Sequence, residues 1–534
     1  MTEDRAAAPL HVSAVVKAAT LCAAIAIVRI IALYANATEL YFDESQYWAW
    51  SQDLAFGYYS KPPLIAWIIG ASELLCGDSE FCVRLPSVAL HAATAFTIFL
   101  ISSELYSSRV GLWAAAAYAT LPGVSVSSGI ISTDAPLLSC WALALLALIQ
   151  LLRAPSWQSV LLLGISLGLG LNAKYAMAYF ILCAGFYFAV SPGHRQLLRR
   201  WHLWCALAIA AAMIAPNLLW NFSHQFATFA HTADNAKWTL SLPNPGKALE
   251  FFSAQFGVMG PVLFGSLLVI VWRQRLCLEC FREKCERFSR QEARQNKVLG
   301  SFHDSTKTGT TLAPLPVPDR LLVAFSMPVL AAVTSQAFLS RAHANWAAVA
   351  YVAATVLVIA HLLRSEHKSW LRASFAFNAV VAVAVAVSAA FAGQINIPGL
   401  GDPFGRLMGN RALAAGVTGV LDEARRHDRP FAAILSDERE LTASLIYYGR
   451  HQSTPVVAWQ SGARPRDHFE MTRNFEGSQP APVLLVSKQR LPAMVTRHFR
   501  GAEPLPDLQI SLGAVPGAAR TFHLFKLWDY RGRP

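Results

Sequence analysis

Long apolar runs separated by short polar loops dominate most of the chain. The run from Ser13 to Ala35 is long enough to cross a bilayer as one helix, and similar runs recur along the sequence. Ser159–Val190 is too long for one helix and is interpreted as two short spans that turn around Lys174, whereas Phe251–Trp272 is interpreted as one helix. With a shorter interfacial or re-entrant helix at Leu64–Leu75, the pattern predicts about eleven membrane-spanning helices.

The pattern changes near residue 396, where apolar segments shorten to the length of strands. They alternate there with helix-like stretches, and this alternation predicts a small α/β domain. The strand-like segments are Phe431–Leu435, Pro455–Trp459, Pro482–Val486 and Thr521–Phe525. We therefore expect a polytopic α-helical membrane region at residues 1–395 and a soluble α/β domain at residues 396–534. With an odd number of spans and a cytoplasmic N-terminus, that domain lies in the periplasm.

Composition and charge distribution support a membrane protein. Hydrophobic residues make up 54% of the 534 residues and charged residues only 15%, and the mean hydropathy is +0.37. The net charge of +12 would suit nucleic acid. However, the basic residues concentrate in loops on one predicted side, such as Arg273–Arg320, as the positive-inside rule expects. We therefore expect membrane lipids as partners, a bacterial inner-membrane location, and no nucleic acid.

Two cysteines bracket a short polar loop on the predicted outer side. Cys76 and Cys82 could form a disulfide in an oxidising periplasm or remain free thiols, and the sequence leaves both possibilities open.

An acidic and aromatic stretch follows the first apolar run. Tyr41–Trp48 contains adjacent carboxylates, Asp43 and Glu44, and Gly57–Pro63 follows it with a lysine. Charge at the membrane surface is costly and is usually kept for a task, although an interfacial loop with an aromatic belt is the simpler alternative. Asp43 is the better candidate for a base, because the side chain of its neighbour Glu44 points elsewhere in either a helix or a strand.

Carboxylates and cations gather on the same predicted side. Transfer of a sugar from a polyprenyl phosphate needs a carboxylate to accept the proton of the acceptor hydroxyl. It also needs cations to offset the charge that develops on the departing phosphate. The candidate catalytic residues are Asp43, Glu44 and Asp134; the candidate phosphate-binding residues are Lys61, Arg84, Lys174 and Arg341; the candidate substrate-binding residues are Tyr47, Trp48, Tyr58, Tyr59 and His343.

Several of these candidates have structural alternatives. Asp134 could be a helix N-cap, Arg84 could anchor a helix at the headgroups, and Lys174 could snorkel at a turn. The aromatic residues could form a belt instead of stacking on a sugar, and His343 could be an ordinary interfacial residue.

Five short motifs together resemble a known family. They are Phe42–Trp48, Gly57–Pro63, Arg84–Pro86, Ser132–Pro136 and Ala342–Trp346. This combination resembles the bacterial GT-C glycosyltransferases related to protein O-mannosyltransferases. Within that group it is most similar to the lipid A aminoarabinose transferases and the rhizobial-type galacturonosyltransferases of lipopolysaccharide.

The resemblance implies an inverting membrane enzyme with an outer-facing site and a polyprenyl-phosphate sugar donor. Asp43 matches the aspartate proposed to be catalytic, and Lys61 matches the lysine proposed to hold the donor phosphate. The aminoarabinose transferases have a glutamate before that lysine, where this chain has Ser60, so a neutral or acidic sugar is expected. Some GT-C enzymes need a divalent metal; metal dependence therefore stays open, and no metal ligand is assigned.

The expected acceptor is lipid A, the lipopolysaccharide core or another envelope glycan. Two alternatives are a protein O-mannosyltransferase-like enzyme and a transporter of lipid-linked sugars. A transporter is expected to place charges near the membrane midplane and to show internal repeats, and the sequence shows neither pattern.

Overall fold

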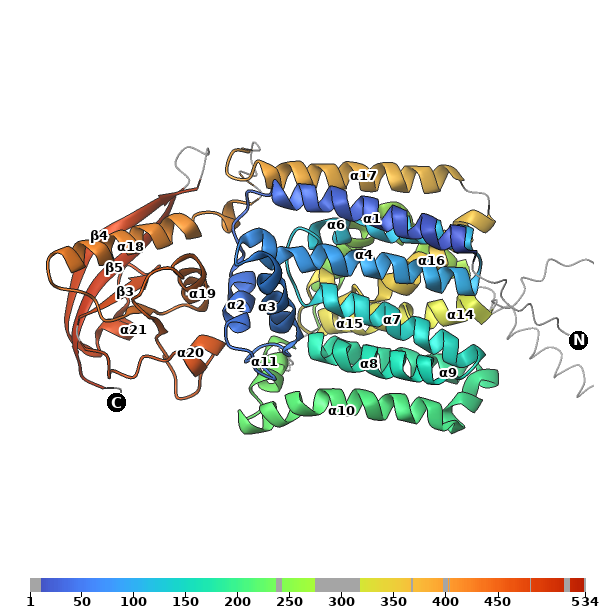
Figure 1. Ribbon diagram of the computed structural model, residues 1–534, viewed down its shortest axis with the longest axis horizontal. Helices are drawn as coiled ribbons and strands as arrows, with labels where there is room; N and C mark the ends of the chain where they lie inside the picture. The colour runs from blue at the N-terminus through green and yellow to red at the C-terminus, as the bar shows by residue number, and fades with distance from the viewer. Residues whose placement is uncertain are drawn as a thin grey trace, which may run out of the picture.

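A computed structural model shows a helical bundle with a mixed α/β unit at one end (Figure 1). The structure describes residues 11–236, 243–273, 317–365, 368–396, 402, 404–480, 482–512 and 519–532. Most of the basic segment predicted as an inner loop, residues 274–316, lies outside the described residues.

Six stretches of the described residues are long and apolar enough to cross a membrane. They are α1 (Val12–Tyr34), α4 (Glu80–Leu105), α7 (Asp134–Arg153), α10 (Trp201–Ser223), α14 with α15 (Val317–Ala324 and Met327–Leu339) and α17 (Lys368–Ala390). The shorter apolar helices are α3 (Leu64–Cys76), α8 (Trp157–Ala173), η1 with α9 (Tyr175–Ala178 and Tyr179–Val190) and α16 (Ala350–Arg364). The predicted count of about eleven spans is therefore not confirmed, because the shorter helices fall below the usual length of about twenty residues.

The single helix predicted at Phe251–Trp272 is wrong. The chain there forms α12 (Pro245–Met259) and a second helix, Pro261–Arg273, which meet at an angle of 117°. Gly260 joins them with φ at 86°, a left-handed conformation that ends a helix and that glycine adopts without steric strain.

A second break separates α5 (Ser108–Thr120) from α6 (Pro122–Ser127). The residue before Pro122 has an extended ψ of 139°, as expected of a residue that precedes proline.

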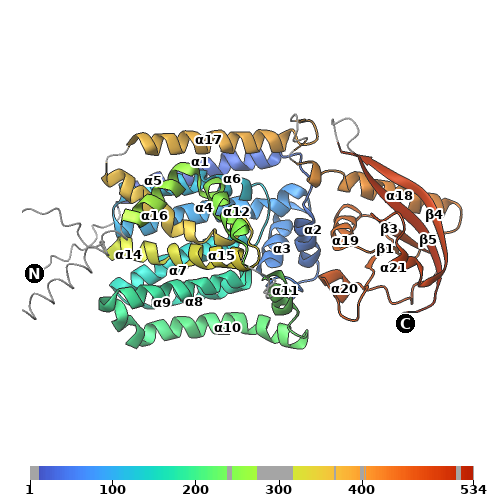
Figure 2. The same cartoon turned by 180° about the vertical axis from the view of Figure 1, so that it is seen from behind.

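Short helices cover the end of the bundle that faces the α/β unit. Helix α2 (Phe42–Ser51) and α3 lie across this end, between the bundle and the sheet, in both views (Figures 1 and 2). Helix α11 (Ala227–Ala236) lies at the same end. The remaining short turns are η2 (Pro192–Arg199), η3 (Ala344–Ala347) and η4 (Gly405–Leu407). The stretch predicted as an acidic loop is thus the helix α2.

The C-terminal α/β unit, residues 404–532, contains a five-stranded sheet in the order β2-β1-β3-β5-β4. Strands β1 (Ile434–Ser436), β2 (Val456–Ala458) and β3 (Val483–Ser487) are parallel, whereas β5 (Ala519–Tyr530) is antiparallel to β3 and to β4 (Phe499–Ser511). Its helices are α18 (Asn410–Arg426), α19 (Arg439–Tyr448), α20 (His468–Thr472) and α21 (Ala493–Thr496). The sequence did not predict β4, because its prolines and polar residues are typical of an edge strand and not of a buried one.

The α/β unit is held against α2 and the loop that follows α3. Cys76 and Cys82 are disulfide-bonded, which settles the alternative that the sequence left open. Within their loop, Asp78 pairs with Arg450 at 2.5 Å, and Glu80 pairs with Arg411 at 2.9 Å. The interface therefore fixes the start of α19 beside α2.

Candidate active site

Glu44 and Arg84 form a buried ion pair. The Nε and Nη2 atoms of Arg84 donate to the two carboxylate oxygens of Glu44 at 2.9 and 2.8 Å, and the side chains are 1% and 2% exposed, respectively. Glu44 also accepts hydrogen bonds from the backbone N–H groups of Tyr41 and Ile131. Arg84 also donates to the backbone carbonyl of Thr38. These contacts tie α2 to α4 and to the loop before α7.

This geometry bears on two predicted roles, which stay predictions. Glu44 was predicted to be catalytic and Arg84 to bind phosphate, but each uses its charge on the other inside the protein. A buried charge needs a complete set of partners, and these two have one within the fold. In this structure the pair connects α2 to α4.

Asp43 lies in the first turn of α2 and is 39% exposed. One of its oxygens, Oδ1, accepts a hydrogen bond from Nη1 of Arg439 at 3.0 Å, and the same Nη1 donates to Gln46 Oε1 at 3.1 Å. Asp43 and Gln46 share one face of α2 because they are three residues apart. The guanidinium of Arg439 lies 4.7 Å from the ring centre of Phe42.

Lys61 supplies a cation that no described residue neutralises. Its side chain makes no hydrogen bond or ion pair within the described part of the chain, although its backbone carbonyl accepts from the N–H of Tyr58 at 3.1 Å. Burial is the main cause that lowers the pKa of Lys61 to about 8; the charges of Lys174 and Arg439 act in the same direction, whereas Asp43 and Asp134 oppose the shift. An ammonium held in this way can bind an anion.

Asp134, Lys174 and Asn345 meet from three different elements. Lys174 Nζ donates to Asp134 Oδ1 at 2.6 Å, and Asn345 Nδ2 donates to Oδ2 at 2.6 Å. Asp134 is the first residue of α7, and Thr133 occupies the N-cap position. The alternative of Asp134 as an N-cap is therefore wrong, and its carboxylate instead forms a fixed polar unit that is 10% exposed.

Two histidines and a further arginine complete the polar cluster. The pKa of His231 is lowered to about 4 by burial and by the charges of Lys61 and Arg439. The pKa of His343 is lowered by burial and then by Arg341, Lys174 and Lys61. Because Arg341 and Lys61 both act on His343, and Lys61 also acts on His231, these groups belong to one electrostatic cluster.

The predicted substrate-binding aromatic residues divide into two groups. Trp48 packs edge-to-face on Tyr447 at 4.9 Å, and Tyr58 stacks on Trp50 at 4.6 Å; both predicted residues are buried. They form the packing between the α2–α3 segment and the α/β unit, so the structure does not support a sugar platform or a lipid-facing belt at these two positions.

Tyr47 and Tyr59 lie nearer to the polar cluster. Burial raises the pKa of Tyr47 well above its usual value, and the charges of Asp43 and Asp134 add to this shift. Tyr59 contacts the ring of His231 at 5.5 Å and donates its hydroxyl proton to the carbonyl of Pro465 at 3.1 Å.

Sequence reasoning missed three residues of this cluster. Asn345 lies inside the stretch Ala342–Trp346, which the sequence singled out only for its histidine. Gln46 lies one turn after Asp43, and its uncharged side chain gave no indication of a site in the sequence. Arg439 is 396 positions from Asp43 along the chain, and no local pattern connects them.

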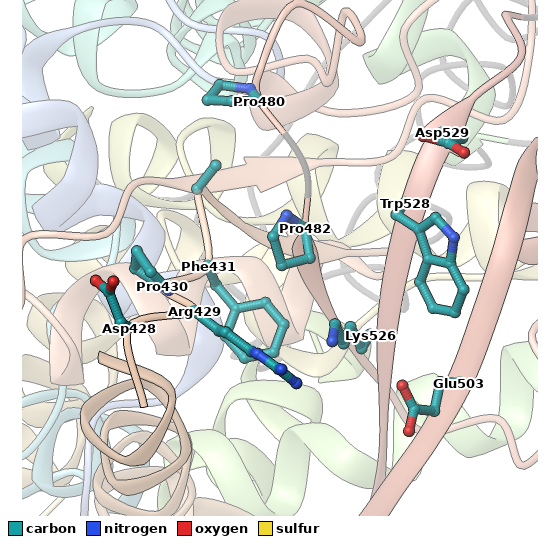
Figure 3. A pocket seen from close by; sticks show the side chains of 11 residues that line it. Asp428, Arg429, Pro430, Phe431, Pro480, Pro482, Glu503, Lys526, Trp528 and Asp529 are labelled. Carbon is teal, nitrogen blue, oxygen red and sulfur yellow. The ribbon is translucent and has the colours of Figure 1, made fainter. Parts of the chain in front are cut away.

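Two other features of the described residues lie apart from this cluster. No group of three or more His, Cys, Asp or Glu side chains that could hold a metal ion is found among them. A groove of about 840 Å³ lies in the α/β unit, where Trp528, Lys526 and Glu503 approach Arg429 and Phe431 (Figure 3). Its lining contains none of the predicted site residues.

Comparison with known proteins gives consistent matches. A family model described as dolichyl-phosphate-mannose-protein mannosyltransferase matches residues 60–220. The undecaprenyl phosphate-alpha-4-amino-4-deoxy-L-arabinose arabinosyl transferase of Pseudomonas aeruginosa is 30% identical over 175 residues, which is 31% of each chain. The crystal structure of ArnT from Cupriavidus metallidurans bound to undecaprenyl phosphate has a TM-score of 0.60 and 12% identity, and the match covers 95% of this chain and 97% of that one. This last match shows a shared fold.

A longer sequence match establishes the family. The lipid A galacturonosyltransferase RgtD of Rhizobium johnstonii is 32% identical over 443 residues, which is 83% of this chain and 84% of that protein. The family predicted from the five motifs is thereby confirmed. The chain belongs to the GT-C glycosyltransferases that modify lipopolysaccharide.

Proposed function

We propose that this protein transfers a sugar from a polyprenyl-phosphate donor to lipid A, the lipopolysaccharide core or another envelope glycan, with inversion at the anomeric carbon. The proposal rests on the different pairing and exposure of three carboxylates at one end of the bundle. Glu44 is sealed in an ion pair and Asp134 is held by Lys174 and Asn345. Asp43 is 39% exposed and close enough to the unpaired Lys61 for their charges to interact.

Asp43 and Lys61 have complementary roles in the proposed reaction. The acceptor oxygen attacks the anomeric carbon while the bond from that carbon to the phosphate oxygen breaks, and the phosphate leaves with the electron pair. Asp43 takes the proton of the acceptor hydroxyl, as a general base. Lys61 offsets the charge that develops on the departing polyprenyl phosphate.

Asp134 and Lys174 support this arrangement as a pair. Lys174 is compensated by Asp134 at 2.6 Å, so its net contribution to phosphate binding is smaller than that of Lys61. The pair fixes the ends of α7 and α8 behind the site. Arg341 and His343 lie at the periphery of the cluster, where they would contact the substrates.

The relatives suggest the kind of sugar and the side of the membrane. RgtD is named a lipid A galacturonosyltransferase, and Ser60 replaces the glutamate expected of an aminoarabinose transferase. Both points favour an acidic sugar, and we propose a uronic acid. The disulfide between Cys76 and Cys82 favours an oxidising compartment, and this supports the proposal that the site and the α/β unit lie in the periplasm.

Mass spectrometry of envelope lipids tests the proposal. A deletion strain is compared with strains that express the wild type or Asp43→Asn. We expect a sugar on lipid A or core that is absent in the deletion strain and is restored by the wild type alone. Unchanged lipid A and core with a sugar lost from proteins would favour the mannosyltransferase-like alternative, which the family match at residues 60–220 keeps open. Accumulation of lipid-linked sugar with no glycan change would favour a transporter.

A further inference from the structure

The α/β unit contributes a cation to the site that the helical region alone lacks. Arg439 is the first residue of α19, and its Nη1 atom contacts both Asp43 and Gln46. The Nε and Nη2 atoms of Arg439 make no hydrogen bond within the described part of the chain. Its side chain is 32% exposed, so the guanidinium is not sealed inside the protein.

The free edge has the geometry that binds a carboxylate elsewhere in this protein. Arg84 donates hydrogen bonds to the carboxylate of Glu44 from the same two atoms, Nε and Nη2, at 2.9 and 2.8 Å. A planar guanidinium matches the two oxygens of a carboxylate in this side-on arrangement, which a lysine ammonium cannot reproduce. Arg439 can therefore bind a carboxylate through one edge while Nη1 keeps its contact with Asp43.

Contacts at the far end of α19 hold the backbone that carries Arg439 in place before a substrate arrives. The hydroxyl of Tyr448, at the other end of α19, accepts a hydrogen bond from the backbone N–H of Leu40 at 2.6 Å and donates one to Glu80 at 2.6 Å. Trp48 packs on Tyr447 in the same helix. A residue fixed in this way loses little conformational entropy when it binds a ligand.

We propose that Arg439 is the specificity residue for the transferred sugar and that its free edge binds a carboxylate on that sugar. The inference rests on the proposed function and adds to it the residue that selects an acidic sugar. Lys61 serves the donor phosphate and Lys174 is compensated by Asp134. Arg439 is also paired with a carboxylate, Asp43, but its Nε and Nη2 atoms stay unused within the described residues, so it can take a second negative group, which we assign to the sugar.

The test uses two polyprenyl-phosphate donors that differ only at C6, galacturonate with a carboxylate and galactose with a hydroxymethyl group. The full-length purified protein and one acceptor are used throughout. The wild type is expected to prefer the galacturonate donor. In Arg439→Gln, kcat/KM for galacturonate should fall about 10- to 100-fold, mainly through KM, because hydrogen bonds to charged groups contribute about 1.5–3 kcal/mol. The galactose rate should fall less, since it loses only the contact of Arg439 with Asp43, so the preference for galacturonate is reduced.

Two further variants sharpen the result. Arg411→Gln removes another arginine from the same interface, where it pairs with Glu80 and not with Asp43; it should retain the preference. Arg439→Lys keeps the positive charge but lacks the planar guanidinium, so it should lose part of the rate with galacturonate only. This variant also tests the inference if Arg439→Gln does not fold.

Three outcomes would overturn the inference. An equal loss with both donors would mean that Arg439 only positions Asp43 or binds an acceptor phosphate. A wild type that uses both donors equally would overturn the inference and leave the proposed function intact. A wild type that uses neither donor would overturn both.

Discussion

Two adjacent carboxylates in α2 should respond to neutralisation in opposite ways. Glu44→Gln leaves the guanidinium of Arg84 buried with its charge uncompensated, since the pair is 2% and 1% exposed. Removing one partner of a buried pair typically destabilises a protein by about 3–5 kcal/mol. For a chain of 534 residues we expect the melting temperature to fall by roughly 3–5 °C.

Asp43→Asn should leave stability almost unchanged. The Asp43 side chain is 39% exposed, and its partner Arg439 is 32% exposed, and such partly exposed pairs contribute only about 0–1 kcal/mol. The melting temperature should therefore shift by less than about 2 °C. Sugar transfer, however, should fall by roughly 10²–10⁴-fold, which is the usual contribution of a general base.

The assay measures both properties on the same detergent-purified samples. Thermal unfolding is followed by intrinsic tryptophan fluorescence, and transfer is followed by mass spectrometry of the acceptor. The reasoning is refuted if Glu44→Gln melts within about 2 °C of the wild type, because Arg84 would then not depend on its partner. It is equally refuted if Asp43→Asn transfers sugar at a near wild-type rate.

Three further predictions follow from the same contacts. The pKa of Lys61 is lowered to about 8, so its side chain is charged below that pH and neutral above it. We therefore expect kcat/KM for the donor to fall as the pH rises through about 8. Lys61→Arg should move this fall to higher pH, and an unchanged pH profile would contradict the assignment of Lys61 to the phosphate. Asp134→Asn and Lys174→Met should each lower transfer, and the double variant should lose little more than either single variant if the two act as a unit; additive losses would argue against a unit. Cys76→Ser removes a disulfide that joins residues of sequence separation 6 and should destabilise the protein by about 2 kcal/mol. Reductant should lower the melting temperature of the wild type by as much as this substitution does, and it should leave the variant unchanged. A wild type insensitive to reductant would contradict this prediction.

The sequence alone determined the membrane character and the family, and it proposed the central residues of the site. Apolar runs are a local property, because a helix in lipid must satisfy its own backbone and present apolar side chains. The motif with Asp43 and the one with Lys61 lie fewer than twenty residues apart and carry charges that membrane segments rarely tolerate. These signals require no knowledge of the fold.

Only the tertiary structure decided which charges are exposed and which are buried against each other. Glu44 and Asp43 are neighbours in sequence, yet one is sealed against Arg84 and the other is open, because successive side chains on a helix point in different directions. Arg439 reaches Asp43 across 396 positions through the docking of α19 on α2. Such a contact depends on packing between distant segments, and no local pattern in the sequence encodes it.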